Sequence, residues 1–349
     1  SLFTAIFITR MLVENHISKS KLLNFSTSLT KNWLSNIGIS FLIKRRISYV
    51  VSGTFIIIGL SSLFINGLNQ GVDFVGGRSY VVRFEQPVSQ EKIQSNLIKV
   101  LGNAEVKTFG SDNQLKITTN YKVDIDSSDI DDEINNILYT DLIEFMPENI
   151  AYEDFVVNGD ENKQAGIMSS IKVGPTIADD IKKNSFYAVF GSLIIVFLYI
   201  LLRFKNWQFS LGAVSAVFHD VLVVLGIFSL TYSFMPFNME INQAFIAAVL
   251  TVIGYSLNDT VVVFDRIREY RNINTSWELP RVVDSALNST LSRTLNTSFT
   301  TLVVLISIFV FGGESIRGFM FALIVGVLIG TYSSVFVATP VMYDTLKNK

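Results

Sequence analysis

Six apolar runs of about 20 residues restrict the possible folds of this chain more than any other feature. Each run is long enough to cross a hydrocarbon core about 30 Å thick as a helix. The chain of 349 residues is 49% hydrophobic, and its mean hydropathy is +0.42. The sequence therefore predicts an α-helical integral membrane protein, with spans two to six inside residues 185–346. The predicted spans are residues 47–66, 185–202, 209–233, 243–264, 295–311 and 318–342.

Basic residues gather at one end of these spans. Short cytoplasmic loops are the ones that carry an excess of Lys and Arg. Loop 234–242 holds none, and loop 312–317 holds one. Both ends of the chain are therefore expected in the cytoplasm, and residues 67–184 outside it. The basic flanking residues are Lys44, Arg45, Arg46, Arg203, Lys205, Arg266, Arg268, Arg271, Arg281, Lys347 and Lys349.

The outer segment has the pattern of a small α+β domain. It is acidic, with 11 Lys/Arg and 20 Asp/Glu between positions 67 and 183. Helical periodicity follows two candidate N-caps, Ser89 and Ser128. The order βαββαβ is the ferredoxin-like arrangement, in which residues 147–165 have no place. The expected strands are residues 80–84, 104–109, 115–118 and 167–173.

Three further segments are expected at or near the cytoplasmic side. Residues 1–13 are apolar and predict the end of a preceding membrane helix. Residues 14–46 predict a cytoplasmic linker, in which residues 29–43 form either a surface-lying amphipathic helix or part of a flexible connector. Residues 270–292 predict a cytoplasmic amphipathic segment, because apolar residues recur at helical spacing between positions 282 and 295.

Charged side chains inside the apolar runs are the candidates for function, because each costs roughly 2.5–3.5 kcal/mol to insert. Asp259 stands in the fourth run, about five residues from its cytoplasmic end and so roughly 7–8 Å deep. Its neighbours Asn258 and Thr260 favour a polar, hydrated pocket. The alternative is an interfacial carboxylate that caps a neighbouring helix or snorkels to the surface.

Three other charged or titratable residues lie in or beside the spans. His219 and Asp220 are near the middle of the third run. Adjacent helix positions point about 100° apart, so these two are not expected to pair with each other. One is expected to face a neighbouring helix while the other lines a path, and a structural contact between helices is the alternative. Arg293 begins the fifth run and either pairs with a buried carboxylate or anchors at the surface.

Two glycine motifs mark the borders of the outer segment. Residues 71–77, Gly-Val-Asp-Phe-Val-Gly-Gly, predict a tight turn that depends on glycine. They lack the lysine and the following helix of a phosphate loop. Gly174 and Pro175 predict a rigid turn into the second span. The motif residues at the first border are Gly71, Asp73, Gly76 and Gly77.

Two further patterns concern the membrane helices themselves. Gly326 and Gly330 are spaced for close packing of two helices. Asp265, Arg266 and Arg268 continue the fourth span beyond its apolar part, and they predict a solvated face.

The sequence offers no motif for catalysis. It has no cysteine, no nucleophile with a base, no cluster of metal ligands and no nucleotide-binding loop, so we expect no enzyme activity, metal or cofactor. The net charge of −2 gives no sign of nucleic-acid binding. Any mechanical work would therefore need an ion gradient or a partner ATPase.

Four stretches are specific enough to compare with known families: residues 71–77, FHD at 218–220, SLNDTVVVFDRIRE at 256–269 and RTLNTSFTTL at 293–302. Together they resemble the SecF family of the bacterial Sec protein-export system. The resemblance covers roughly residues 44–349. Residues 1–10 resemble the end of the last helix of SecD, so the chain is similar to the C-terminal part of a fused SecDF protein.

The resemblance implies an RND-superfamily half, one of two six-helix halves that enclose a proton path. It implies an accessory of the Sec translocon in the bacterial cytoplasmic (inner) membrane, which uses the proton motive force to promote late preprotein translocation. Asp259 and Arg293 match the family's essential aspartate and arginine, while a second aspartate belongs to SecD. The implied partners are the SecD half, SecYEG, YajC- and YidC-type factors, unfolded preprotein and membrane lipid.

Two alternative functions are open to a chain of this design. An RND-type exporter of lipids or small molecules would carry a larger outer domain than the segment 67–184. A scaffold that only stabilises the translocon would tolerate neutral residues at positions 259 and 293.

Overall fold

The computed structural model describes residues 3–19, 38–125, 128–148, 150–157 and 163–347. The chain divides into two compact units, Ser1–Ile39 and Ser40–Lys349. The first unit contains a π-helical turn, η1 (Thr4–Ile8), that continues into α1 (Thr9–Ser18). The helix proposed for residues 29–43 falls mainly outside the described residues, and its described part, 38–43, is coil and turn.

Within the described residues of the second unit, six helices are long and apolar enough to cross a membrane, as predicted. Four of them extend beyond the predicted runs, because helical hydrogen bonding continues into polar sequence that hydropathy does not mark. The helices are α2 (Arg45–Ile65), α7 (Pro175–Phe204), α8 (Trp207–Thr231), α9 (Gln243–Ile273), α10 (Leu279–Phe311) and the span Glu314–Leu346, which comprises α11 (Glu314–Ser333), η3 (Ser334–Ala338) and most of α12 (Thr339–Lys347). Helices α2 and α8 instead begin two residues before the predicted start and end one and two residues before the predicted end.

The predicted cytoplasmic amphipathic segment is not a separate helix, because α10 is continuous from Leu279 to Phe311. The apolar residues at its start are buried against other helices of the bundle, with Val283 and Ala286 fully covered. Pro280 occupies the first turn, where its missing N–H costs nothing. Residues 279–294 therefore belong to the same continuous helix as the fifth span.

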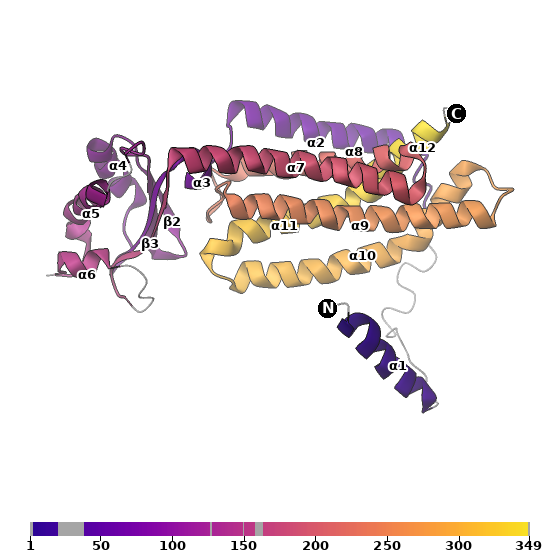
Figure 1. Cartoon of the computed structure of the whole chain (residues 1–349), viewed down its shortest axis with the longest axis horizontal. Helices are drawn as coiled ribbons and strands as arrows, with labels where there is room; N and C mark the ends of the chain where they lie inside the picture. The colour runs from indigo at the N-terminus through magenta and orange to yellow at the C-terminus, as the bar shows by residue number, and fades with distance from the viewer. Residues whose placement is uncertain (1–2, 20–37, 126–127, 149, 158–162, 348–349) are drawn as a thin grey trace. The chain divides into compact units, whose positions relative to one another are not determined.

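Helix α8 lies at the centre of the bundle and contacts α2, α7, α9, α11 and α12 (Figure 1). Small residues let α2 approach it closely: a Cβ at Gly226 would lie 2.5 Å from the Cα of Gly59. One turn further along α2, the hydroxyls of Ser62 and Ser229 are 2.8 Å apart. This is the small-residue packing with added hydrogen bonds that joins helices in membranes.

The second unit also contains the predicted ferredoxin-like domain. The sheet order is β2-β3-β1-β4 and each neighbouring pair is antiparallel, so the order βαββαβ is confirmed. Ser89 caps α4 by accepting a hydrogen bond from the Lys92 N–H. The elements are α3 (Val72–Val75), β1 (Gly77–Arg83), α4 (Gln90–Leu101), β2 (Glu105–Phe109), β3 (Ser111–Thr119), α5 (Ser128–Leu142), η2 (Ile143–Phe145), α6 (Tyr152–Val156) and β4 (Gly166–Val173).

The core of this domain lies between one face of the sheet and helices α4 and α5 (Figure 1). Alternation along β1 buries Tyr80 and Val82 on that face. Leu97 and Leu138 cover them from the helices and are fully buried. Fully burying a leucine contributes roughly 1.5–3 kcal/mol, so this face holds the domain together. The opposite face carries polar and charged side chains, among them Lys116.

Candidate functional site

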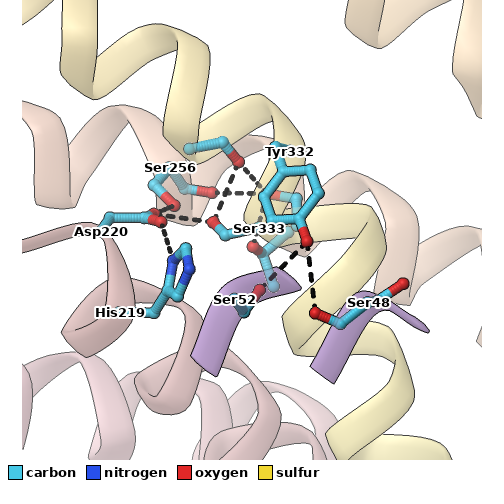
Figure 2. A network of polar contacts seen from close by, with 10 residues as sticks. Ser48, Ser52, His219, Asp220, Ser256, Tyr332 and Ser333 are labelled. Carbon is cyan, nitrogen blue, oxygen red and sulfur yellow. Dashed lines mark hydrogen bonds and ion pairs between the residues drawn. The ribbon is translucent and has the colours of Figure 1, made fainter. Parts of the chain in front are cut away.

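Asp220 is the most completely buried charged residue among those described, with 0% of its surface exposed. Its carboxylate accepts hydrogen bonds from Ser256 Oγ at 2.6 Å and from Ser333 Oγ at 2.8 Å. Figure 2 shows these side chains converging from α8, α9 and α11. A buried carboxylate is tolerated when such partners replace its hydration, so this group ties three helices together.

His219 does pair with its neighbour Asp220, against expectation from their adjacent positions. The distance from His219 Nδ1 to Asp220 Oδ1 is 3.0 Å. The backbone directions differ by about 100°, but the side-chain torsions turn the imidazole back towards the carboxylate (Figure 2). The ring centroid of His219 is 6.1 Å from that of Tyr332. The sequence argument was wrong because it considered Cβ directions only.

The network continues from Tyr332 to helix α2. The Tyr332 hydroxyl is 3.1 Å from Ser52 Oγ and 3.4 Å from the Ser48 carbonyl (Figure 2). His219 Nε2 is buried and has no hydrogen-bond partner among the described residues. The buried polar centre therefore involves α2 as well as α8, α9 and α11, and it contains one titratable pair.

Asp259 lies on α9, three positions after Ser256, and is 3% exposed. Its carboxylate is in a different situation: Oδ2 is buried without a hydrogen-bond partner in the described part of the chain. Arg293 on α10 is near enough to interact with this carboxylate electrostatically, although no ion pair joins them among the described residues. Arg293 itself is exposed. Asp259 is thus shielded within the bundle, with an exposed arginine nearby.

The two polar neighbours of Asp259 lie on different sides of α9, so they do not form one pocket. Thr260 is fully buried, and its hydroxyl is 2.9 Å from Ser334 Oγ. Asn258 is exposed on the face that the rest of this chain leaves open. Residues two positions apart on a helix point about 200° apart, which the sequence-based interpretation neglected.

Sequence reasoning missed three serines, Ser256, Ser333 and Ser334. The last two lie at the junction of α11 and the π-helical segment η3, a helix type that often occurs at functional sites. Gly326 and Gly330 were the available signal. A Cβ at Gly326 would overlap the Val252 side chain, so these glycines do serve close packing of α11 on α9. That packing brings the serines to Asp220 and Thr260.

The described residues contain no group of three His, Cys, Asp or Glu side chains that could hold a metal ion. The side-chain groups at this site that can exchange protons are carboxylates, an imidazole and hydroxyls. Such a set can accept, hold and pass protons, and it can fix helices relative to one another.

The profile of the family "Protein export membrane protein SecD/SecF, C-terminal" matches residues 155–348, and the "SecD/SecF GG Motif" profile matches residues 61–88. The chain is 44% identical over 310 residues to "Protein translocase subunit SecF" of Rhodothermus marinus, covering 88% of this chain and 94% of the relative. The chain belongs to the SecF family. The subunit of the same name from Thermodesulfovibrio yellowstonii is 36% identical, with 90% of this chain and 97% of the relative covered.

Solved SecDF structures give the same fold. The crystal structure described as SecDF, a translocon-associated membrane protein, from Thermus thermophilus superposes with a TM-score of 0.79 at 27% identity. SecDF in a super-membrane-facing form gives a TM-score of 0.67 at 26% identity. Each comparison covers 99% of this chain but 43% of the SecDF chain. The architecture is therefore that of the SecF half, a six-helix RND-type half with a ferredoxin-like domain.

The GG motif of this SecF-family chain forms the predicted turn between α3 and β1. Gly76 and Gly77 have φ angles of +73° and +133°, which glycine adopts without strain. A Cβ at Gly77 would lie 2.6 Å from the Thr119 carbonyl oxygen. Asp73 Oδ2 accepts a hydrogen bond of 3.0 Å from the Gln243 N–H at the start of α9. The motif therefore reaches the membrane helices as well as the sheet.

The other two predicted motifs occupy helix ends. Gly174 is the N-cap of α7 and Pro175 its first residue, where proline is favoured. Asp265 is partly exposed, which agrees with the expected solvated face, and it also links two helices. Its carboxylate accepts from Arg203 at the end of α7, at 2.9 Å, and from Arg268, at 2.8 Å. Arg266 pairs with Glu269 at 2.8 Å on the exposed side.

Proposed function

We propose that this SecF-family chain forms one half of a SecDF-type assembly that uses the proton motive force to promote late preprotein translocation. The observation that supports the proposal is the buried Asp259 carboxylate, with its unpartnered oxygen and Arg293 nearby. A carboxylate in such a place is stable only when it is protonated or when a cation compensates its charge. It can therefore change partner during a proton-driven cycle.

The change of partner at Asp259 follows from the positions of its carboxylate and the Arg293 guanidinium. When the guanidinium of Arg293 approaches Asp259, the charged carboxylate is favoured, and when it withdraws, the protonated form is favoured. Arginine keeps its charge throughout, so it acts as a fixed cation on a movable helix. Each proton that binds or leaves therefore alters the attraction between α9 and α10. This couples proton passage to a change in helix packing.

The His219–Asp220 pair supports the same cycle, because it contacts α9 at Ser256, about one helical turn from Asp259. The pair and Ser256 hold α9 beside α8, and Ser333 does the same for α11. Because the hydrogen bonds of Asp220 are satisfied, we assign it the role of positioning Asp259. The imidazole of His219, whose buried Nε2 has no hydrogen-bond partner in the described part of the chain, can extend the proton path towards α2.

A SecD half is the partner that the open face of the bundle requires. Arg293, Asn296 and Thr300 follow helical spacing along α10 and are exposed, as is Asn258 on α9. Polar groups facing lipid at this depth are costly, so another protein surface is expected to cover them. We place the second aspartate of the proton path in that half.

The remaining assignments follow the same proposal. The chain lies in the bacterial cytoplasmic membrane, with residues 67–184 periplasmic and both ends cytoplasmic, and it has no enzymatic activity of its own. SecYEG, YajC- and YidC-type factors and unfolded preprotein are the proposed partners beside SecD. The basic residues of the loops at one end of the spans support this orientation.

The test compares two aspartates on α9 in inverted membrane vesicles that carry the full SecDF assembly. Asp259→Asn is expected to abolish the stimulation of preprotein translocation by a proton gradient while membrane insertion is unchanged. Asp265→Asn, the same substitution at a partly exposed position, is the matched control and should retain the stimulation. Normal gradient-dependent translocation in the Asp259→Asn assembly would contradict the proposal.

A further inference from the structure

The outer end of α9 is attached to the ferredoxin-like domain through side chains of both parts. Lys116 on β3 pairs with Glu240 in the loop before α9. This ion pair is largely removed from solvent, with side-chain exposures of 14% for Lys116 and 4% for Glu240. Asp73 of the GG motif accepts from the Gln243 N–H at 3.0 Å. We call Asp73, Lys116 and Glu240 the α9 clamp.

The backbone reinforces the clamp. Gln70 and Ile241 form an isolated parallel bridge. The Gly71 N–H donates to the Ile241 carbonyl at 2.9 Å, and the Ile241 N–H donates to the Asn69 carbonyl at 2.7 Å. A Cβ at Gly71 would lie 3.2 Å from Glu240 Oε2. A glycine at this position thus lets the segment that leads into β1 lie directly against the segment that leads into α9.

The sheet does not pack flat on the helices around this clamp. A cavity of about 230 Å³ lies between the open face of the sheet and the outer ends of α9 and α11. Ser79 and Ser169 line it from the sheet, and Asn242 and Ser315 line it from the helix side. Beside the clamp the two parts are therefore separated by a cavity, while Val72 and Val173 of the domain pack on Ala178 of α7.

Helix α9 connects the clamp with Asp259. It is one helix from Gln243 to Ile273 and contains no proline. At about 1.5 Å per residue, Asp259 lies roughly 24 Å along the axis from the clamp. A shift or rotation of α9 that follows a change at Asp259 is therefore carried to Glu240 and Gln243.

We propose that the α9 clamp transmits the movement of α9 to the ferredoxin-like domain, so that Asp73, Lys116 and Glu240 are positioning residues that convert proton passage into motion outside the membrane. This inference rests on the proposed function. A buried ion pair adds little net stability compared with apolar packing, but removing one partner leaves an uncompensated charge. The pair is thus suited to holding one geometry between two moving parts.

The experiment measures proton flux and preprotein translocation separately in vesicles with the full SecDF assembly. Lys116→Glu and Glu240→Lys are each expected to lower translocation by about tenfold or more, because each places like charges together at a buried site. Proton flux should stay close to that of the unchanged assembly, which also reports that the helix bundle has folded. The double variant Lys116→Glu/Glu240→Lys restores the pair and should recover most of the translocation.

Two matched controls sharpen the result. Lys122 pairs with Glu133 inside the same domain, at 2.7 Å and half-exposed, so Lys122→Glu should leave translocation nearly unchanged. Asp73→Ala should lower translocation, whereas Asp73→Asn keeps an oxygen that can accept from the Gln243 N–H and should retain it.

Three outcomes would contradict the proposal that the α9 clamp transmits movement. They are normal translocation in both single variants, an equal loss of proton flux and translocation, or no recovery in the double variant. A failure of the proposed function can be told apart from a failure of the clamp. If the proposed function were wrong, the assembly with Asp259→Asn would conduct protons and translocate preprotein like the unchanged assembly.

Discussion

Asp220 and Asp259 are both buried carboxylates in the helix bundle, yet the surroundings of the two aspartates differ. The two sites are close, because Ser256, which binds Asp220, is only three positions from Asp259 on α9. Asp220 has two serine donors and a histidine, while one oxygen of Asp259 has no partner among the described residues. A satisfied carboxylate is well suited to fixing helices. A carboxylate with an unsatisfied oxygen, near the exposed Arg293, is suited to exchanging a proton. The comparison shows that burial alone does not distinguish the two roles.

The largest expected effect comes from exchanging each aspartate for its amide. Asp259→Asn should abolish proton-dependent translocation and leave the unfolding temperature in detergent unchanged. Asp220→Asn should lower the unfolding temperature, because a neutral amide accepts weaker hydrogen bonds from the two serines. Gradient-dependent translocation should still be measurable in that variant. If both variants showed the same pattern, the difference in role between the two aspartates would be wrong.

The next effect concerns the glycines that bring the serines to Asp220. Gly326→Ala places a Cβ against the Val252 side chain, and overpacking of this kind costs about 1–3 kcal/mol. Thermal unfolding of the purified assembly measures it. Gly254→Ala is the control, because a Cβ there meets nothing within 4 Å in the described part of the chain. Equal effects at positions 326 and 254 would remove the packing explanation.

Removing one serine donor should have an effect of about the same size. Ser256→Ala and Ser333→Ala each delete one hydrogen bond to the Asp220 carboxylate, and a hydrogen bond to a charged acceptor is worth roughly 1.5–3 kcal/mol. Because both serines bind the same oxygen, the free energies of unfolding should not add in the double variant. Strict additivity in a double-mutant cycle would show that the two bonds are independent.

The smallest effect is expected at a carboxylate outside the membrane, Asp131 in the ferredoxin-like domain. Partial burial raises the pKa of Asp131, but hydrogen bonds from Lys172 and Arg78 outweigh it, so the pKa lies below the ordinary value. A lowered pKa contributes stability above the unfolded-state value, about 3.9, and this stability is lost as the pH falls through the folded-state pKa. Asp131→Asn should therefore make the free energy of unfolding fall less steeply as the pH is lowered into the acid range. An unchanged slope in that range would contradict this assignment.

Much of the architecture could be predicted from the sequence, because hydropathy and turn chemistry are local. The six spans follow from runs of apolar residues, and the order βαββαβ follows from alternation, helical spacing and caps such as Ser89. The turn at Gly76 and Gly77 follows from their required φ angles. Asp259 was identifiable because a carboxylate is rare inside an apolar run.

The tertiary structure alone decided which of these groups meet. Rotation of α9 separates Thr260 from Asn258, and side-chain torsions join His219 to Asp220. The approach of α11 at Gly326 selects Ser333 as a partner, while the clamp pairs Lys116 with Glu240, 124 positions away. The physical reason is that hydropathy records where a helix lies along the membrane normal, but not its rotation or its neighbours, which depend on packing between distant segments.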